Sequence, residues 1–196
     1  MNETALTAEQ ILTATEDVLR RYGPGKATVV DVARELNVSH GSVYRHFPSK
    51  TAMREAVTRR WLDHACAGLT EIVERDGPAA DRLDRWLLAL FLAKKEKAAA
   101  DPALFATYAV LADHSSETVV EHLRDLVAQL TTIIVDGIGR GEFAETDPST
   151  AAQAVFDATV VFRSPLHSWR WTIPTIDAEF AAVRKVILNG LVQCRR

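Results

Sequence analysis

The sequence predicts an all-α protein of nine helices, arranged as a small domain followed by a larger one. Apolar residues recur at three-and-four spacing along almost the whole chain, which is the pattern of amphipathic helices. Residues 131–135 and 159–162 are β-branched enough for strands, but both lie inside longer helical stripes without turn signals beside them. At 196 residues the chain exceeds one average domain and falls short of two.

Three helices are expected in the first 48 residues. The first begins after Thr7, which can form a capping box with Gln10, and ends at residues 23–25, which read Gly-Pro-Gly. The second and third begin after Thr28 and Ser39, two further residues that cap helices well.

A long fourth helix is expected over residues 50–75. At 1.5 Å per residue it would measure about 40 Å, more than a small domain needs, so it should begin in one domain and end in the next. We therefore place the domain boundary near residue 52, between a domain of residues 1–52 and a domain of residues 53–196. Five further helices are expected at 79–98, from 102, from 116, from 148 and at 176–193. Gly141 should end the seventh helix, and Gly190, inside the last one, suggests that another helix packs closely there.

Composition describes an ordinary soluble protein, with 47% hydrophobic and 25% charged residues. The longest purely apolar run, residues 86–93, is far shorter than the roughly 18–20 residues that span a bilayer. The first ten residues lack the basic flank and apolar stretch of a secretory signal. Cys66 and Cys194 form neither a disulfide framework nor a metal-ligand spacing. We therefore expect a cytoplasmic protein without a metal or cofactor.

Residues 28–50, TVVDVARELNVSHGSVYRHFPSK, have the pattern of a helix-turn-helix. Ala33 is small enough for the two helices to cross closely, and Asn37 tolerates the left-handed backbone of a tight turn. Val38 fills the corner between the helices, and Ser39 caps the second one. In such a motif the second helix lies in the major groove of DNA.

The predicted exposed face of this second helix contains no acidic and no aliphatic residue. Its members are Ser39, His40, Gly41, Ser42, Tyr44, Arg45 and His46. Hydroxyl, imidazole and guanidinium groups contact phosphates and base edges, and Gly41 would let the backbone approach DNA. Thr28 and Lys50 stand at helix N-termini, where a phosphate is favoured. These features favour DNA binding over a solvated structural hairpin.

The stretch DVARELNVSHGSVYRHFPSKTAMREAV resembles the DNA-binding domain of the TetR/AcrR family of one-component transcriptional regulators, most specifically in residues 43–47 and in Ser49-Lys50. A weaker resemblance is GRGEFAETDPSTAA (139–152), which is similar to the turn before the family's eighth helix. The resemblance implies a three-helix DNA-binding domain and a six-helix ligand and dimerisation domain. It also implies a homodimer, paired through about 148–163 and 176–193, on double-stranded operator DNA. By the same resemblance, Thr28, Tyr44, His46 and Lys50 contact phosphates, whereas Ser39, His40, Ser42 and Arg45 face base edges.

The resemblance further implies a small apolar or amphipathic effector bound among the fifth to eighth helices. Candidate pocket residues are Trp86, Phe105, Tyr108, Phe156, Phe162 and His167. Aromatic residues at helical spacing usually belong to the core, and that alternative stays open. Asp157 and Arg163 lie in an otherwise apolar helix, where a charge needs a partner, and they serve either the effector or the dimer interface. Residues 163–174, RSPLHSWRWTIP, are expected to be non-helical and to cover the pocket or the dimer interface rather than face solvent.

Signatures of an enzyme are absent from the sequence, which has no GxSxG, HExxH or phosphate-binding glycine loop. The pair Asp63-His64, and Asp113-His114 with His122, do not have the spacing of a metal site and are expected at the surface. The predicted function is a dimeric transcriptional regulator, most simply a repressor released from DNA by a small molecule. A DNA-binding protein without an effector and, more weakly, a helical enzyme are the alternatives.

Overall fold

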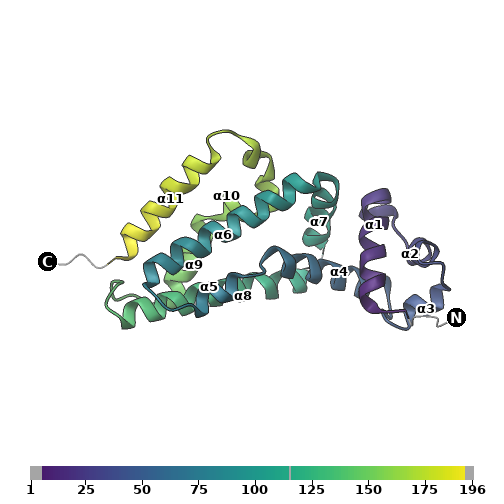
Figure 1. Cartoon of the computed structure of the whole chain (residues 1–196), viewed down its shortest axis with the longest axis horizontal. Helices are drawn as coiled ribbons and strands as arrows, with labels where there is room; N and C mark the ends of the chain where they lie inside the picture. The colour runs from purple at the N-terminus through teal and green to yellow at the C-terminus, as the bar shows by residue number, and fades with distance from the viewer. Residues whose placement is uncertain (1–5, 115, 193–196) are drawn as a thin grey trace. The chain divides into compact units, whose positions relative to one another are not determined.

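The structure is a computed structural model that describes residues 6–114 and 116–192 (Figure 1). The named elements in these ranges are all helices, which confirms the predicted all-α fold. Phe143 and Val192 form an isolated antiparallel bridge outside any named strand. No helix in the described ranges is long and apolar enough to cross a membrane.

The chain forms two compact units. The first combines Met1–His64 with Asp101–Val119, and the second combines Ala65–Ala100 with Val120–Arg196. Each unit therefore brings together segments that are distant in the sequence.

The first unit contains the three expected N-terminal helices and two more. Its elements are α1 (Ala8–Lys26), α2 (Val29–Glu35), α3 (His40–Tyr44), α4 (Lys50–Ala65) and α7 (Pro102–His114). The predicted caps are present, because Thr7 forms a capping box with Gln10 and the side chains of Thr28 and Ser39 accept backbone hydrogen bonds. Gly23 leaves the helical conformation within α1, at φ +72°, where the first helix was predicted to end.

Apolar side chains from several helices form the core of the first unit. Helix α1 packs against α2 and α7, and α2 packs against α3 (Figure 1). The best-buried members of this core are Ile11, Val18, Leu19, Val32, Val43 and Val57. Val43 anchors α3 from its inner side, so the other side chains of that short helix face outward.

The second unit is built around α6 (Ala79–Ala100). Its other elements are α5 (Leu69–Glu74), most of α8 (Ser116–Gly139), α9 (Pro148–Ala158), α10 (Val160–Arg163), the 3-10 helix η1 (Pro165–Thr172) and α11 (Ile176–Leu191). Helices α5, α10 and α11 and the segment η1 all contact α6. Gly141, at φ +69°, follows the end of α8 as predicted.

Two of the predicted helices are divided in the structure. The continuous helix expected over 50–75 is wrong, because α4 ends at Ala65 and α5 starts after Gly68. Gly68 lies at φ +86°, a left-handed conformation that interrupts an α-helix and that glycine adopts without steric cost. The helix that begins after Asp147 is interrupted at Thr159, whose hydroxyl donates to the carbonyls of Val155 and Phe156.

Residues 163–174 were expected to be non-helical, and this expectation is wrong. Most of the segment forms the 3-10 helix η1. Trp171 is buried and donates from Nε1 to the carbonyl of Val161 at 2.9 Å, whereas Trp169 and Leu166 are 67% and 77% exposed. No atom of the described chain lies within 4 Å of a Cβ built at Gly190, so no other helix of the same chain makes the close packing expected there. The last helix, expected to run to residue 193, ends at Leu191, and residue 193 itself lies outside the described residues.

Candidate DNA-binding surface and effector region

The turn between α2 and α3 has the geometry that the sequence predicts. Asn37 lies at φ +53°, in the left-handed region. The amide of Val38 donates to the carbonyl of Ala33 at 3.0 Å, which closes the turn. Ser39 then caps α3, because its hydroxyl accepts from the amide of Ser42 at 3.2 Å. The two helices therefore meet as a helix-turn-helix.

Polar contacts along α3 hold its outward-facing side chains. The hydroxyls of Ser39 and Ser42 lie 3.0 Å apart, and Nη2 of Arg45 donates to the Ser42 hydroxyl at 3.1 Å. The rings of His40 and Tyr44 meet edge to face, with centroids 6.4 Å apart. The guanidinium of Arg45 thus lies beside the Ser42 hydroxyl, and the imidazole of His40 lies beside the phenol of Tyr44.

All of the predicted DNA contacts except Thr28 lie between residues 39 and 50, and most of them are exposed. Ser39, His40, Gly41, Tyr44, Arg45 and His46 are exposed, while Ser42 and Lys50 are half-buried. Lys50 is the first residue of α4, next to Ser49, whose hydroxyl accepts from the amide of Ala52 at 3.0 Å. We call the exposed side chains of 39–46 the recognition face.

Thr28 is exposed, but its hydroxyl is already hydrogen-bonded within α2. Its hydroxyl donates to Oδ2 of Asp31 at 2.6 Å and accepts from the Asp31 amide at 3.2 Å. The hydrogen bond from Thr28 is the largest cause that holds the pKa of the Asp31 carboxyl below its usual value. The hydroxyl could donate to a phosphate only by giving up its bond to Asp31.

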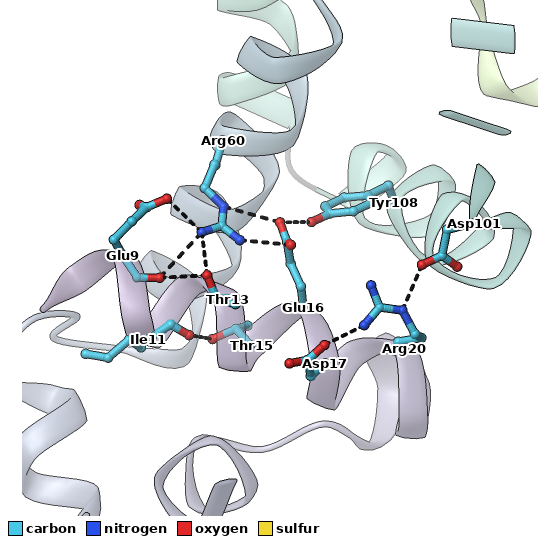
Figure 2. A network of polar contacts seen from close by, with 10 residues as sticks. All are labelled: Glu9, Ile11, Thr13, Thr15, Glu16, Asp17, Arg20, Arg60, Asp101 and Tyr108. Atoms are coloured by element: carbon cyan, nitrogen blue, oxygen red, sulfur yellow. Dashed lines mark hydrogen bonds and ion pairs between the residues drawn. The ribbon is translucent and has the colours of Figure 1, made fainter. Parts of the chain in front are cut away.

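A polar network in the first unit was not foreseen from the sequence (Figure 2). The guanidinium of Arg60, on α4, pairs with Glu9 at 2.9 Å and with Glu16 at 2.8 Å. The hydroxyl of Tyr108, on α7, donates to Glu16 at 2.8 Å. Arg20 pairs with Asp101 at 2.7 Å in the same region. The available signal was the spacing of polar residues 9, 13, 16 and 20, which places them on one face of α1.

The six predicted pocket residues are divided between the two units. Phe105 and Tyr108 belong to the first unit, where they pack on Trp61 with ring centroids 5.7 and 4.5 Å away. Burial raises the pKa of the Tyr108 hydroxyl far above its usual value, so this group stays protonated. Both rings therefore belong to the aromatic packing of the first unit, and their predicted place in an effector pocket stays a prediction.

The remaining four candidates lie in the second unit. Trp86 is fully buried on α6 and donates from Nε1 to Gln129 at 2.7 Å. Phe162 packs on Phe91 and Phe180, with centroids 5.8 and 4.7 Å away. Phe156 is buried under the guanidinium of Arg163, and His167, on η1, is half-buried.

Arg163 makes only a marginal ion pair with Asp157, the residue considered with it. The two charged groups are 4.0 Å apart, and the Asp157 side chain is 65% exposed. The Arg163 guanidinium instead lies 3.4 Å from the centre of the Phe156 ring and donates from Nε to the Phe156 carbonyl. Burial lowers the pKa of this guanidinium to about 10, so it remains a cation at neutral pH.

His122 was expected at the surface and is instead half-buried. Its Nε2 lies 3.5 Å from Sγ of Cys66, and burial together with the charge of Lys94 lowers its pKa to about 4. His64 is exposed, as expected. The side chains of Asp113 and His114 lie outside the described residues.

Relatives of this chain include DNA-binding regulators. An HTH-type transcriptional repressor of Mycobacterium tuberculosis is 36% identical over 80 residues, which cover 41% of this chain and 40% of the relative. The nucleoid occlusion factor SlmA of Vibrio atlanticus is 30% identical over 123 residues, 62% of this chain and 59% of the relative. The match thus spans about two fifths of the length of the mycobacterial relative.

Solved structures share the fold over nearly the whole chain. A protein of unknown function from Rhodococcus sp. RHA1 matches with a TM-score of 0.73 and 22% identity, covering 98% of this chain and all of the other. The regulator FadR of Bacillus subtilis, solved in complex with stearoyl-CoA, matches with a TM-score of 0.70 and 19% identity, covering 94% of this chain and 99% of the other.

Two family models cover most of the chain between them. Residues 11–57 match the family described as bacterial regulatory proteins, tetR family. Residues 79–184, more than half of the chain, match the tetracyclin repressor-like C-terminal domain. Members of this family are transcriptional regulators and not enzymes, which confirms the prediction that the chain has no enzymatic activity. The chain belongs to the TetR family of bacterial transcriptional regulators.

Proposed function

We propose that this regulator is a homodimeric repressor that binds double-stranded operator DNA through the recognition face and is released by a small effector. The region 1–52 would carry the DNA contacts, and the region 53–196 would carry effector binding and dimerisation. We infer that it acts in the cytoplasm, because its DNA target lies there.

One observation carries the DNA-binding part of this proposal. Residues 36–54 contain no Asp or Glu, while five of them are basic or imidazole side chains: His40, Arg45, His46, Lys50 and Arg54. A segment without acidic side chains does not repel the phosphates of DNA. Contacts to these phosphates contribute most of a protein's affinity for DNA. The exposure of the recognition face is what such contacts require.

The roles of the two central side chains follow from their chemistry. Arg45 presents a planar guanidinium, the group that pairs with the two acceptors of guanine in the major groove. Tyr44 is 42% exposed and ends in a single hydroxyl, which suits a phosphate oxygen. We therefore assign base readout to Arg45 and backbone positioning to Tyr44.

The homodimer is supported by the uncovered face of α11. Within the described chain this helix buries only Ile176 and Phe180, both in its first half. Val186 is 72% exposed, and the space at Gly190 is open. Val160, on α10, is 38% exposed. A second copy packed on α9, α10 and α11 would cover these apolar positions, which water disfavours.

Release by an effector requires two states with different spacing of the DNA-binding parts. Two recognition helices must lie about 34 Å apart to enter successive major grooves. An effector that binds better to a dimer with another spacing lowers the population that fits the operator. It can shift the equilibrium only by its differential affinity for the two states.

The DNA-binding assignment can be tested with the full chain and operators selected from random double-stranded DNA. Arg45→Ala should change sequence preference and cost about 1–3 kcal/mol at the position it reads. Tyr44→Phe should weaken binding to all sequences and reduce the salt dependence by about one phosphate contact. Arg85→Ala, an exposed position on α6, should change neither property. Tight operator binding by a variant that lacks both Arg45 and Tyr44 side chains would overturn the assignment.

The dimer and the effector can be tested together by native mass spectrometry of protein purified gently from its own cells. The expected species has twice the 21.6 kDa chain mass plus a small mass that is lost on denaturation. Val186→Glu should give a monomer with weakened operator binding. A bare wild-type dimer that small molecules never release from DNA would favour a regulator without an effector.

A further inference from the structure

Lys94 occupies a core position of the second unit. The buried stripe of α6 runs through Leu83, Leu87 and Leu90, and Lys94 continues it four residues further on. The residue is 5% exposed, whereas its neighbour Lys95 is half-exposed. Lys94 therefore places an ionisable amino group among buried apolar side chains, a position that lysine rarely occupies.

Polar groups from two other segments interact with this lysine. Cys66 precedes α5, and its thiol faces Nε2 of His122, on α8, at 3.5 Å. Lys94 interacts electrostatically with both of these groups. His122 stays neutral beside it at physiological pH, because burial and the positive charge of Lys94 keep its pKa near 4. Near Lys94 the second unit therefore offers hydrogen-bonding groups and positive charge.

A second buried cation approaches from α10. The side chain of Arg163 is only 12% exposed, and its positive charge acts on Lys94 strongly enough to lower the Lys94 pKa, as does that of Lys97. Burial is the larger cause of the lowered pKa. The carboxylate of Asp157 stands 4.0 Å from Arg163 and points mostly to solvent. An anion bound beside Lys94 and Arg163 would interact favourably with both.

Aromatic side chains border the same place. Phe91 lies one turn before Lys94 on α6, and Phe162 directly precedes Arg163. The rings of Phe91, Phe162 and Phe180 contact one another, with centroids 4.5 to 5.8 Å apart. A ligand that reaches Lys94 and Arg163 would therefore also meet the apolar rings beside them. Small-molecule sites are mostly apolar and orient the ligand by a few polar groups.

We propose that the effector of this regulator is a small amphipathic anion, whose acidic group binds beside Lys94 and Arg163 and whose apolar body packs against the neighbouring phenylalanines. This inference rests on the proposed effector-released function and specifies its ligand class. Lys94 offers its amino group from α6 and Arg163 its guanidinium from α10, so the anion would bridge two helices that already touch.

Two fluorescent probes that differ by one acidic group test this directly. They are 1-anilinonaphthalene-8-sulfonate and the uncharged N-phenyl-1-naphthylamine, titrated into the purified full chain without DNA. The wild-type protein should bind the sulfonate at least tenfold more tightly. Lys94→Met should lower sulfonate affinity at least tenfold and leave the affinity for the uncharged probe within twofold. Equal affinity of the wild-type protein for the two probes would overturn the proposal.

Matched variants separate a charge effect from a structural one. Lys94→Arg keeps the charge and should keep the preference for the sulfonate, and Arg163→Met should reduce it. Arg85→Gln removes a cation from the exposed side of the same helix and should change neither affinity. If Lys94→Met weakens both probes equally, or if Arg85→Gln acts like Lys94→Met, the site assignment is wrong.

Competition identifies the acidic group. Octanoate that displaces the sulfonate probe better than octanol indicates a carboxylate effector, and octyl phosphate that does so indicates a phosphate. Octanol that displaces it as well as either anion would contradict the proposal. The probe titrations contain no DNA, so they test only the effector site. A negative probe result leaves the proposed operator binding untouched, and a loss of operator binding leaves the probe result unchanged.

Discussion

The hydroxyl of Tyr108 donates a 2.8 Å hydrogen bond to Oε1 of Glu16, across 92 residues of sequence. The same carboxylate holds the guanidinium of Arg60, so α1, α4 and α7 meet at one acidic group (Figure 2). The Tyr108 ring is stacked on Trp61 at 4.5 Å, which positions the hydroxyl. The network thus ties the first helix of the DNA-binding region to a helix that follows α6 in the chain.

Tyr108→Phe should lower the free energy of unfolding by about 1 kcal/mol, because it removes one partly buried hydrogen bond and keeps the stacked ring. Urea unfolding followed by circular dichroism measures this change. Tyr22→Phe, at an exposed tyrosine of α1, is the control and should change stability by less than about 0.5 kcal/mol. Equal effects of the two substitutions would show that the bond to Glu16 contributes nothing.

Gly41→Ala should separate folding from DNA binding. A Cβ at this position meets only the Ser39 hydroxyl, at 3.7 Å, so alanine fits and should raise stability by about 0.5–1 kcal/mol. The added methyl group stands on the recognition face and should weaken operator affinity on the order of tenfold. Thermal unfolding and DNA titration measure the two effects. Unchanged operator affinity would mean that the backbone of α3 does not approach DNA closely.

Gly137→Ala should destabilise the second unit by about 1–3 kcal/mol through overpacking. A Cβ there would overlap the buried ring of Phe143 and lie 2.9 Å from Cβ of Ala79. Gly139→Ala, two residues along α8, meets nothing within 4 Å and serves as the matched control. Denaturant unfolding should therefore show a loss for the first variant alone, and tolerance of both would contradict the close contact.

His122 should make stability depend on pH in the acidic range. Its pKa is about 4 in the folded protein, against 6.5 for an ordinary histidine. Between pH 6.5 and pH 4 the histidine is protonated in the unfolded chain and neutral in the folded chain. The free energy of unfolding therefore falls as the pH drops through this range. The loss should reach at most about 3 kcal/mol, and it should be absent above pH 7.

His122→Gln is the matched variant for this titration, because it keeps a polar group towards Cys66 and carries no proton equilibrium. The difference in unfolding free energy between wild type and variant should be flat above pH 7 and shift in favour of the variant below it. Subtracting the two curves removes the contribution of carboxylates such as Asp147, whose pKa is about 2. Parallel curves from pH 7 to pH 4 would show that His122 is not buried as described.

Short-range features of this protein are readable from the sequence because they depend on neighbouring residues. Thr7, Thr28 and Ser39 cap helices through hydrogen bonds to residues three positions on, and Asn37 makes its left-handed turn without help from distant segments. The acid-free segment and the helix-turn-helix are local in the same sense, so the family and the candidate DNA contacts follow from them.

Other features of the protein depend on how the helices pack and could not be predicted from neighbouring residues. Gly68 could have continued a helix, and its turn at φ +86° separates α4 from α5. Phe105 and Tyr108 pack on Trp61, a contact between helices that are distant in the sequence. Lys94 is buried at a position of α6 whose environment includes residues distant in the sequence, such as Cys66 and Arg163. The sequence alone determined the helices and the DNA-binding motif through contacts within a turn or two, whereas burial depends on distant segments and was decided by the tertiary structure.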